Sequence, residues 1–221
     1  PAARARSLSE EQGYAILDAL RVPHAPFVTM PLSGPAATPP FGYPVVAKVC
    51  SEHIAHKTDI GGVVLDIRDD AGLNRALQAL RDNLQRRAPG IDCDKVLVQP
   101  LCKGLAEVLI GYRVDPDAGP IVMLAAGGIW AEVSRDRSIR LAPVSVDIAR
   151  EMIAEVRLLK TVSGLRGKQR GDLQALAEAI SALSQLAAKP ELRVREAEVN
   201  PLLILPEGQG VLAVDALILQ Y

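Results

Sequence analysis

Residues 44–67 read "PVVAKVCSEHIAHKTDIGGVVLDI", and this stretch decides how the rest of the chain is interpreted. Two short runs rich in β-branched residues predict strands at 43–49, which begins one residue before the quoted stretch, and at 62–67. The connection between them carries two histidines, a lysine, an aspartate and a glycine pair. A simple turn does not require so many polar and ionisable side chains, so the connection is the first candidate for a ligand site.

The glycine pair and two lysines give this stretch the character of a phosphate cradle. Gly61 and Gly62 expose backbone N–H groups and let a ligand approach closely, and Lys48 and Lys57 add positive charge. The Walker pattern GxxxxGK[ST] is absent, and a plain hairpin whose glycines only satisfy turn geometry is the alternative. Lys48 favours the phosphate interpretation, because a lysine in an apolar strand is unfavourable to bury unless an anion meets it.

His56 is the candidate catalytic residue of the connection. It is flanked by Lys57 and Asp59, and an imidazole can act as a nucleophile toward a phosphoryl group held in line. A lone histidine is more often structural than catalytic, which is the alternative here. His24 and His53 have no such setting and are expected to be exposed to solvent.

A second group of polar residues lies in "EAEVNP", residues 196–201. In a strand, Glu196, Glu198 and Asn200 share one face, and Ala197 and Val199 face the core. Oxygen ligands without Cys or His suit Mg²⁺ bridging to a nucleotide. A solvated acidic edge strand is the alternative.

Asp215 ends the next predicted strand, "VLAVD". Folding that strand back on "LLIL" brings Asp215 beside Asn200 or Pro201. A one-residue register shift decides whether Asp215 faces the same side as the other acids, and both registers stay open. Weaker candidates, which a charged strand edge or an exposed loop explains equally well, are Glu107, Glu132, Asp136, Arg166 and Lys168.

Composition excludes several classes of function. The 221 residues are 49% hydrophobic but only 3% aromatic, with a formal net charge of -1. Few stacking platforms and no positive excess argue against a nucleic-acid partner. No apolar run reaches the roughly 18–20 residues of a membrane span. Three cysteines without a C-x-x-C pair favour buried thiols in a reducing cytoplasm.

The pattern of elements predicts an α+β fold with antiparallel sheets. "SEEQ" is a capping box that starts a helix over about 10–21, and residues 30–43 are a Pro- and Gly-rich loop. Asp69 or Asp70 caps a helix whose inward residues are Leu73, Ala76, Leu77, Leu80 and Leu84. Further strands are expected at 95–101, 106–114 and 120–125, and throughout the C-terminal "VREAEVN", "LLIL" and "VLAVDALIL".

Two more helices are expected in the second half of the chain. One starts at Ser145 or Asp147, with Ile148, Met152, Val156 and Leu159 inward. The other follows Asp172, with Leu173, Leu176, Ile180 and Leu183 inward, after a basic glycine-rich loop at 164–171. A soft boundary near 100–104 predicts two unequal lobes. The chain begins at Pro1 without Met, which suggests a domain or processed form of a larger protein.

Taken in order, these pieces resemble the ATP-grasp domain of the ADP-forming (NDP-forming) acyl-CoA synthetases, a group related to succinyl-CoA synthetase β subunits. The stretches that carry the resemblance are "GYPVVAK", "HKTDIGGV", "VLVQPL", "AEVLIGYRVDP", "GGIWAEVSRD", "RLAPVS", "GLRGK" and "EAEVNPLLILPEG…VDA". The resemblance implies an ATP-grasp fold of two lobes, each with a mainly antiparallel sheet and packed helices, and a nucleotide cleft between them. The implied boundaries are 1–30 for an N-terminal helix and connection, 31–103 for the first lobe and 104–221 for the second.

The resemblance also implies roles for individual residues. ATP or ADP with Mg²⁺ is the implied cofactor pair. Phosphates are assigned to Lys48, Lys57, Gly61 and Gly62, adenine and ribose to Val98, Gln99, Leu101 and Glu107, and the metal to Glu198, Asn200 and Asp215. His56 resembles a histidine that receives a phosphoryl group in turn.

The implied reaction converts an acid, CoA and ATP to acyl-CoA, ADP and phosphate through a phosphohistidine. It requires a CoA-binding or CoA-ligase domain or subunit as partner, which binds the acid and CoA. Departures from the usual pattern are Ala118, Ala125 and the proline-rich 30–43, where relatives usually carry a helix. A catalytically incomplete regulatory or assembly module, and an ATP-grasp ligase that joins a carboxylate to an amine, remain the alternatives.

Overall fold

The computed structural model describes residues 6–127, 136–164, 167 and 169–221, and these divide into two compact units. Unit 2 consists of Ser7–Gln12 and Ala25–Cys102. Unit 1 consists of Gly13–His24 and Lys103–Tyr221 with Arg6, as far as these ranges are described. The helix α1 (Glu10–Leu20) therefore contributes its first turn to unit 2 and its remainder to unit 1.

Helix α1 begins with the predicted capping box. The Ser9 N–H donates to Gln12 Oε1 at 2.9 Å, and the Gln12 N–H donates to Ser9 Oγ at 3.3 Å. This reciprocal pair satisfies backbone groups that a helix start leaves without an intrahelical partner. The side chain at the next position, Glu10, is thereby held in the first helical turn.

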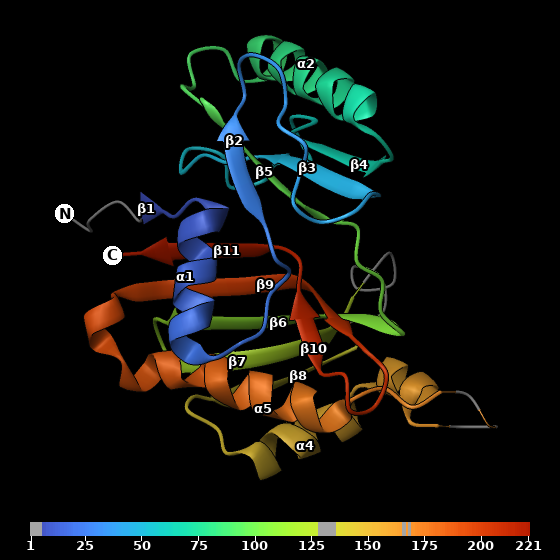
Figure 1. The fold of residues 1–221 in the computed structure, drawn as a ribbon. Helices are drawn as coiled ribbons and strands as arrows, with labels where there is room; N and C mark the ends of the chain where they lie inside the picture. Colours follow the sequence, from blue (N-terminus) through green and yellow to red (C-terminus); the bar gives the residue numbers. More distant parts are fainter. Residues whose placement is uncertain (1–5, 128–135, 165–166, 168) are drawn as a thin grey trace. The chain divides into compact units, whose positions relative to one another are not determined.

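Unit 2 is a four-stranded antiparallel sheet covered by one helix (Figure 1). The strand order is β2 (Val28–Pro31), β5 (Lys95–Pro100), β3 (Val45–Val49) and β4 (Val63–Ile67). Helix α2 (Asp70–Arg87) packs on β3 and β4. Its buried face is the predicted one, formed by Leu73, Ala76, Leu77, Leu80 and Leu84.

The Pro- and Gly-rich loop is fastened to the first turn of α2. The Tyr43 hydroxyl donates to Asp70 at 2.6 Å, and the Thr38 hydroxyl donates to the same carboxylate at 3.0 Å. Burial first, and then the Asp70 carboxylate, raise the pKa of Tyr43 to about 12. The loop was predicted to begin at residue 30, which is two residues too early, because Met30 and Pro31 belong to β2. This strand lies at the sheet edge, where a proline is tolerated.

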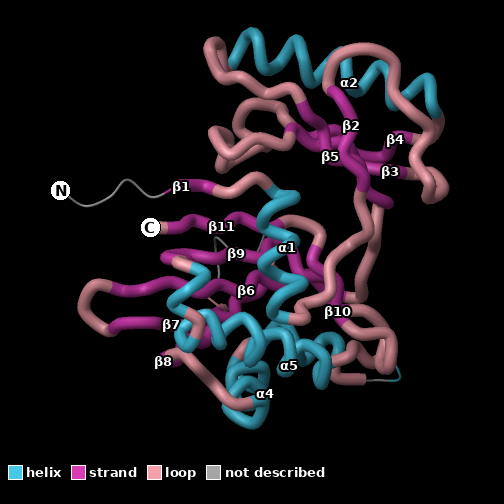
Figure 2. Tube along the Cα trace, turned by 60° about the vertical axis from the view of Figure 1, so that its left-hand side comes forward, coloured by secondary structure: helices cyan, strands magenta, loops and turns pink. Residues whose placement is uncertain are grey.

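The larger sheet has seven strands and carries the rest of the fold (Figures 1 and 2). Its order is β1 (Arg6–Ser7), β11 (Ala216–Gln220), β9 (Val194–Ile204), β6 (Ala106–Asp115), β7 (Gly119–Ala126) and β8 (Arg137–Leu141), with β10 (Val211–Ala213) also paired to β9. Helices α4 (Val146–Glu155) and α5 (Leu173–Ser184) pack together, α5 against β6 and β7 and α4 against β8. Short 3-10 helices span Arg157–Val162, Gln185–Ala188 and Pro190–Leu192.

Alternation along the strands gives this sheet one buried face. Val108, Ile110 and Tyr112 are buried in β6, whereas Gly111 and Arg113 face the other way and line a hollow. The antiparallel organisation predicted from the element pattern is confirmed in both sheets. The hollow on the open face is the place to look for polar function in unit 1.

Three sequence predictions need correction in unit 1. Ile148 is 37% exposed rather than inward, although Met152 on the same helix is fully buried. The predicted C-terminal strand is divided into β10 and β11, with a break at Val214 and Asp215. Strand β8 was not predicted, because its apolar residues Ile139 and Leu141 lie on the exposed face and give no core signal.

Asp172 holds the C-terminal hairpin to helix α5. Its Oδ1 accepts the N–H of Ala175 at 3.0 Å, the predicted N-cap, and its Oδ2 accepts the N–H groups of Gly208 and Gly210, both at 2.9 Å. The Ala175 N–H first, and then those of Gly210 and Gly208, lower the pKa of the Asp172 carboxyl. One side chain therefore caps the helix and fixes the turn between β9 and β10.

Among the helices in the described parts of the chain, none combines the length and apolar character that crossing a membrane requires.

Candidate functional site

A buried cluster of one carboxylate and two lysines lies in unit 2. Lys48 is on β3, Lys57 is in the connection that follows it, and Glu10 is in the first turn of α1. Lys48 Nζ lies 2.7 Å from Glu10 Oε1, and Lys57 Nζ lies 3.0 Å from Glu10 Oε2. All three side chains are almost completely buried. The structure thus brings together the two lysines that the sequence proposed for phosphates.

Glu10 is the site residue that sequence reasoning missed. It was interpreted only as part of the capping box, and acids are common in the first turn of a helix. Its neighbour Glu11 is of the same type but only half-buried. The available signal was Lys48 itself, because a lysine inside an apolar strand needs a buried anionic partner.

The glycine pair has structural reasons for being glycine. Gly61 has φ 66°, and a Cβ there would lie 2.7 Å from Asn83 Nδ2, which donates to the Gly61 carbonyl at 2.8 Å. A Cβ on Gly62 would lie 2.6 Å from Val49 Cγ2, and its N–H donates to the Lys57 carbonyl at 2.7 Å. The pair therefore closes the connection tightly and places Lys57 at the end of β3.

The three histidines have different surroundings. His56 is exposed, directly before the buried Lys57. His53 is exposed as predicted, with 63% of its side chain accessible. His24 is not exposed as predicted, because its ring stacks on Tyr14 with 4.3 Å between centroids and its Nε2 lies 3.1 Å from Asp18. His24 is therefore a structural residue, and His56 remains accessible to a reactant.

The segment proposed to meet adenine lies on a central strand of unit 2. Val98 and Gln99 are buried on β5, which pairs with β2 on one side and β3 on the other. The Leu101 N–H donates to the Pro44 carbonyl at 2.9 Å. These positions are therefore fixed by the sheet. Glu107, proposed for the ribose, is exposed on β6 of unit 1.

The acidic group of unit 1 lies where the strand pattern predicts. Ala197 and Val199 are buried, and Glu196 and Glu198 line the hollow on the open face of the sheet. Asn200 Nδ2 donates to Glu198 Oε1 at 3.2 Å, so these two side chains are adjacent.

The pairing of β9 with β11 brings the Asp215 backbone beside Asn200. Ala216 pairs with Val199, and the Asn200 N–H donates to the Asp215 carbonyl at 3.2 Å. Asp215 itself lies in the break between β10 and β11.

These residues fit a partial magnesium site. In the described part of the chain, no group of three or more His, Cys, Asp or Glu side chains could hold a metal ion by itself. Mg²⁺ is usually held by one or two carboxylates together with substrate phosphates, rather than by an all-protein cage. Glu198, Asn200 and Asp215 offer that kind of oxygen set.

The hollow beside Glu198 also carries positive charge. Its volume is about 270 Å³, and its lining includes Arg113 and Arg137 as well as Glu196. Arg113 pairs with Asp115 at 2.7 Å. The mixture of cations and carboxylates suits an anion that arrives with a metal ion.

The weaker candidates divide into structural and undescribed residues. Asp136 accepts the N–H groups of Arg157 and Leu158 at 2.9 and 2.8 Å, which caps the 3-10 helix Arg157–Val162. Its role is therefore structural. Glu132, Arg166 and Lys168 lie outside the described residues.

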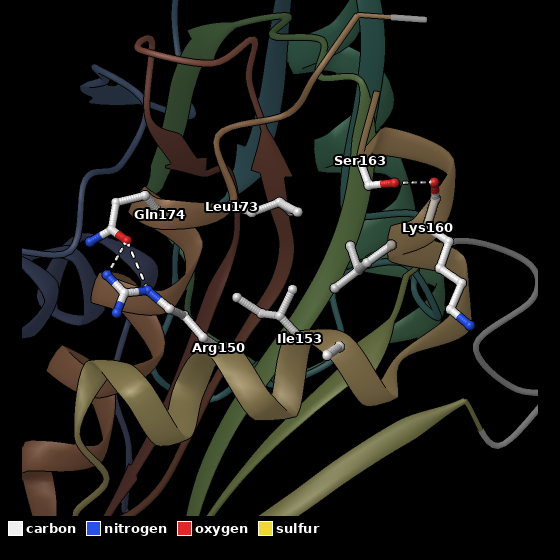
Figure 3. Close-up of a pocket in the computed structure, with 8 residues that line it drawn as sticks. Arg150, Ile153, Lys160, Ser163, Leu173 and Gln174 are labelled. Carbon is white, nitrogen blue, oxygen red and sulfur yellow. Dashed lines mark hydrogen bonds between the residues drawn. The ribbon is translucent and has the colours of Figure 1, made fainter. Parts of the chain in front are cut away.

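A separate cavity of about 430 Å³ lies between α4, the Arg157–Val162 helix and α5 (Figure 3). Its walls are mainly apolar, with Ile153 and Leu173 among them, and Arg150 and Lys160 are also in its lining. Arg150 donates to Gln174 Oε1 across it. None of the residues proposed for nucleotide or metal lines this cavity.

Comparison with known proteins gives concordant matches. A family model described as "ATP-grasp domain" matches residues 1–219. The 4-hydroxybutyrate–CoA ligase [ADP-forming] of Nitrosopumilus maritimus is 34% identical over 211 residues, which is 95% of this chain but 30% of the ligase. The β subunit of acetate–CoA ligase [ADP-forming] I of Pyrococcus furiosus is 36% identical over 176 residues, 79% of this chain and 74% of the subunit.

A solved structure extends the match to three dimensions. The dinucleotide forming acetyl-coenzyme A synthetase 1 of Ca. Korarchaeum cryptofilum, in complex with coenzyme A, Ca-AMPCP and HgCl+, has a TM-score of 0.86 and 29% sequence identity. The match covers 98% of this chain and 94% of that one. This chain thus spans about 30% of the 4-hydroxybutyrate–CoA ligase but most of the matched synthetase chain.

Proposed function

The chain belongs to the ATP-grasp domain family, and from this premise we propose that it is the nucleotide-binding part of an ADP-forming acyl-CoA synthetase. The whole enzyme would convert an acid, CoA and ATP to acyl-CoA, ADP and phosphate. The observation that carries the proposal is the burial of Lys48 and Lys57 on one carboxylate. Two buried ammonium groups held close together by that carboxylate suit the binding of a polyphosphate.

Lys48 and Lys57 are the proposed phosphate ligands. Phosphoryl transfer depends mainly on positioning and charge neutralisation. Both lysines would neutralise the charge of the phosphates. The tight closure at Gly61 and Gly62 holds Lys57 close to β3. Val98, Gln99 and Leu101 are proposed for the adenine and Glu107 for the ribose.

Glu198, Asn200 and Asp215 are the proposed oxygen ligands of Mg²⁺. A bound magnesium nucleotide supplies the phosphoryl group and neutralises its developing charge. The residues of this chain hold the ion through two carboxylates and an amide. Support comes from the matched synthetase, which was solved with a calcium complex of AMPCP.

His56 is the proposed acceptor of a phosphoryl group. It is exposed and adjacent in sequence to the proposed phosphate ligand Lys57. Incubation with MgATP labelled in its γ-phosphoryl group, which would pass to the His56 imidazole with release of ADP, followed by peptide mapping, tests this role. His53→Ala is the matched control for His56→Ala. Label that survives in His56→Ala contradicts it.

A CoA-binding or CoA-ligase part is the proposed partner. The matched relatives are either a longer ligase, of which this chain spans 30%, or the β subunit of an enzyme. The acid and CoA would reach the reaction through that partner.

The proposal is tested by calorimetric titration with MgADP and MgATP. One charge-assisted hydrogen bond contributes about 1.5–3 kcal/mol, so Lys48→Ala should weaken affinity about ten- to a hundredfold. Lys95→Ala, which removes an exposed lysine from the neighbouring strand, is the control and should change little. Natural affinity in Lys48→Ala would refute the proposed phosphate site.

A further inference from the structure

Glu10 joins two segments of unit 2 that are far apart in the sequence. It lies 38 residues before Lys48 in the sequence, on a helix rather than on the sheet. Its relative exposure is 3%, compared with 4% for Lys48 and 9% for Lys57. Each of its carboxylate oxygens lies within 3.0 Å of a different ammonium group. The carboxylate is therefore shared by both lysines.

Two neighbouring buried ammonium groups are unfavourable without a counter-charge. Desolvation disfavours each charge, and the charges repel each other. Removing a carboxylate partner from a buried ammonium favours loss of its proton or movement toward water, and either change weakens a phosphate ligand. Breaking such a buried network by removing one member is far more damaging than losing an exposed ion pair.

We propose that Glu10 is the positioning residue of the phosphate site, since its carboxylate holds the Lys48 and Lys57 ammonium groups charged and in place for a nucleotide phosphate. This inference rests on the proposed nucleotide-binding function. The capping box of Ser9 and Gln12 fixes the helical turn that carries Glu10. The opposite role, in which Glu10 competes with phosphate for the lysines, predicts the opposite sign in the experiment below.

The experiment measures MgADP affinity of the full-length protein by calorimetry, at about pH 7 and about pH 9. Glu10→Gln removes the charge and keeps the side-chain size, and Glu10→Asp keeps the charge but shortens the reach. Glu11→Gln is the matched control, because it removes the neighbouring carboxylate in the same helical turn. Thermal unfolding of each variant checks its fold.

We expect Glu10→Gln to weaken MgADP affinity about ten- to a hundredfold at pH 7. The loss should grow toward about pH 9, because a buried ammonium group that has lost one carboxylate partner is less favourable in its charged form. Glu10→Asp should recover part of the affinity, and Glu11→Gln should match the natural protein. A purely structural role would not create this pH dependence.

Affinity in Glu10→Gln that equals or exceeds the natural value at both pH values overturns the proposal. If Glu10→Gln does not fold, the MgADP affinity of Glu10→Asp is the test. An affinity of Glu10→Asp equal to that of the natural protein would contradict the positioning role of Glu10. Lys48→Ala separates the two hypotheses. If Lys48→Ala weakens binding and Glu10→Gln does not, only the role of Glu10 fails. If the natural protein does not bind MgADP, both the proposed function and this inference fail.

Discussion

At the scale of single residues, the connection between β3 and β4 shows how packing and ligand chemistry can require the same amino acid. Gly61 was proposed as a residue that lets phosphate approach. The structure gives it an independent reason, because its φ is 66° and Asn83 lies against the position of a Cβ. A stability measurement can separate the strain of this backbone conformation from the contact with Asn83.

Gly61→Ala should lower the free energy of unfolding by about 1–2 kcal/mol for the left-handed backbone alone. The collision with Asn83 Nδ2 should add to this loss. Gly90→Ala is the matched control, because Gly90 has φ 89° and nothing within 4 Å of a Cβ. Urea unfolding of both variants gives the difference. Equal losses would mean that Asn83 moves aside freely and that the contact does not matter.

The sequence indicated Lys48 and Lys57 as candidate site residues, but it did not indicate the carboxylate between them. Lys48 stood out because its neighbours in the strand are apolar. Glu10 did not, since an acid in the first helical turn has a sufficient local explanation. The contact spans 38 residues and depends on how a helix start meets a sheet. Periodicity along a chain carries no information about such a meeting.

At the scale of elements, prediction succeeded where one face of an element is buried. Helix α2 presents a 3.6-residue apolar pattern, and all five predicted inward residues are buried. The predictions for strand β8 and for Ile148 of α4 were wrong for the converse reason. Their apolar side chains face outward, so an apolar residue there does not indicate the core.

Asp172 gives the clearest prediction at this scale, because it joins α5 to the β9–β10 turn. Asp172→Ala removes a helix cap and the acceptor of two further hydrogen bonds, so it should lower the free energy of unfolding by about 1–3 kcal/mol. Asp147→Ala is the control, since that carboxylate is 85% exposed at the first turn of α4. Chemical denaturation at neutral pH measures both.

The lowered pKa of Asp172 predicts that the stability of the protein depends on pH. The folded-state pKa of Asp172 is lowered, so its contribution is fully present above the unfolded value of about 3.9 and is lost as pH falls through the folded pKa. The difference in stability between the natural protein and Asp172→Asn should therefore shrink below about pH 4. A difference that stays constant down to pH 2–3, roughly, would show that the charge of Asp172 is not what stabilises the turn.

At the scale of the whole molecule, the two candidate sites have unequal support. In the lysine cluster of unit 2, the two contacts of the Glu10 carboxylate with Lys48 and Lys57 are described at the level of atoms. The acidic group of unit 1 is incomplete as a metal site without phosphate oxygens. Nucleotide binding should therefore depend on Lys48 in the presence or absence of metal, and on Glu198 only when Mg²⁺ is present.

This chain spans 30% of the 4-hydroxybutyrate–CoA ligase and matches a β subunit of an acetate–CoA ligase, which supports the proposal that it is one part of a larger enzyme. We expect this chain alone to bind MgADP yet to form no acyl-CoA from acid, CoA and ATP, because the proposed function assigns the CoA-binding part to a partner. Adding that part, fused or as a separate subunit, should produce ADP release that requires both acid and CoA. Lys48→Ala in the complete assembly is the control and should abolish most of this release, whereas Lys95→Ala should not. Acyl-CoA formation by the chain alone would show that it contains a complete active site, and the division of labour proposed here would then be wrong.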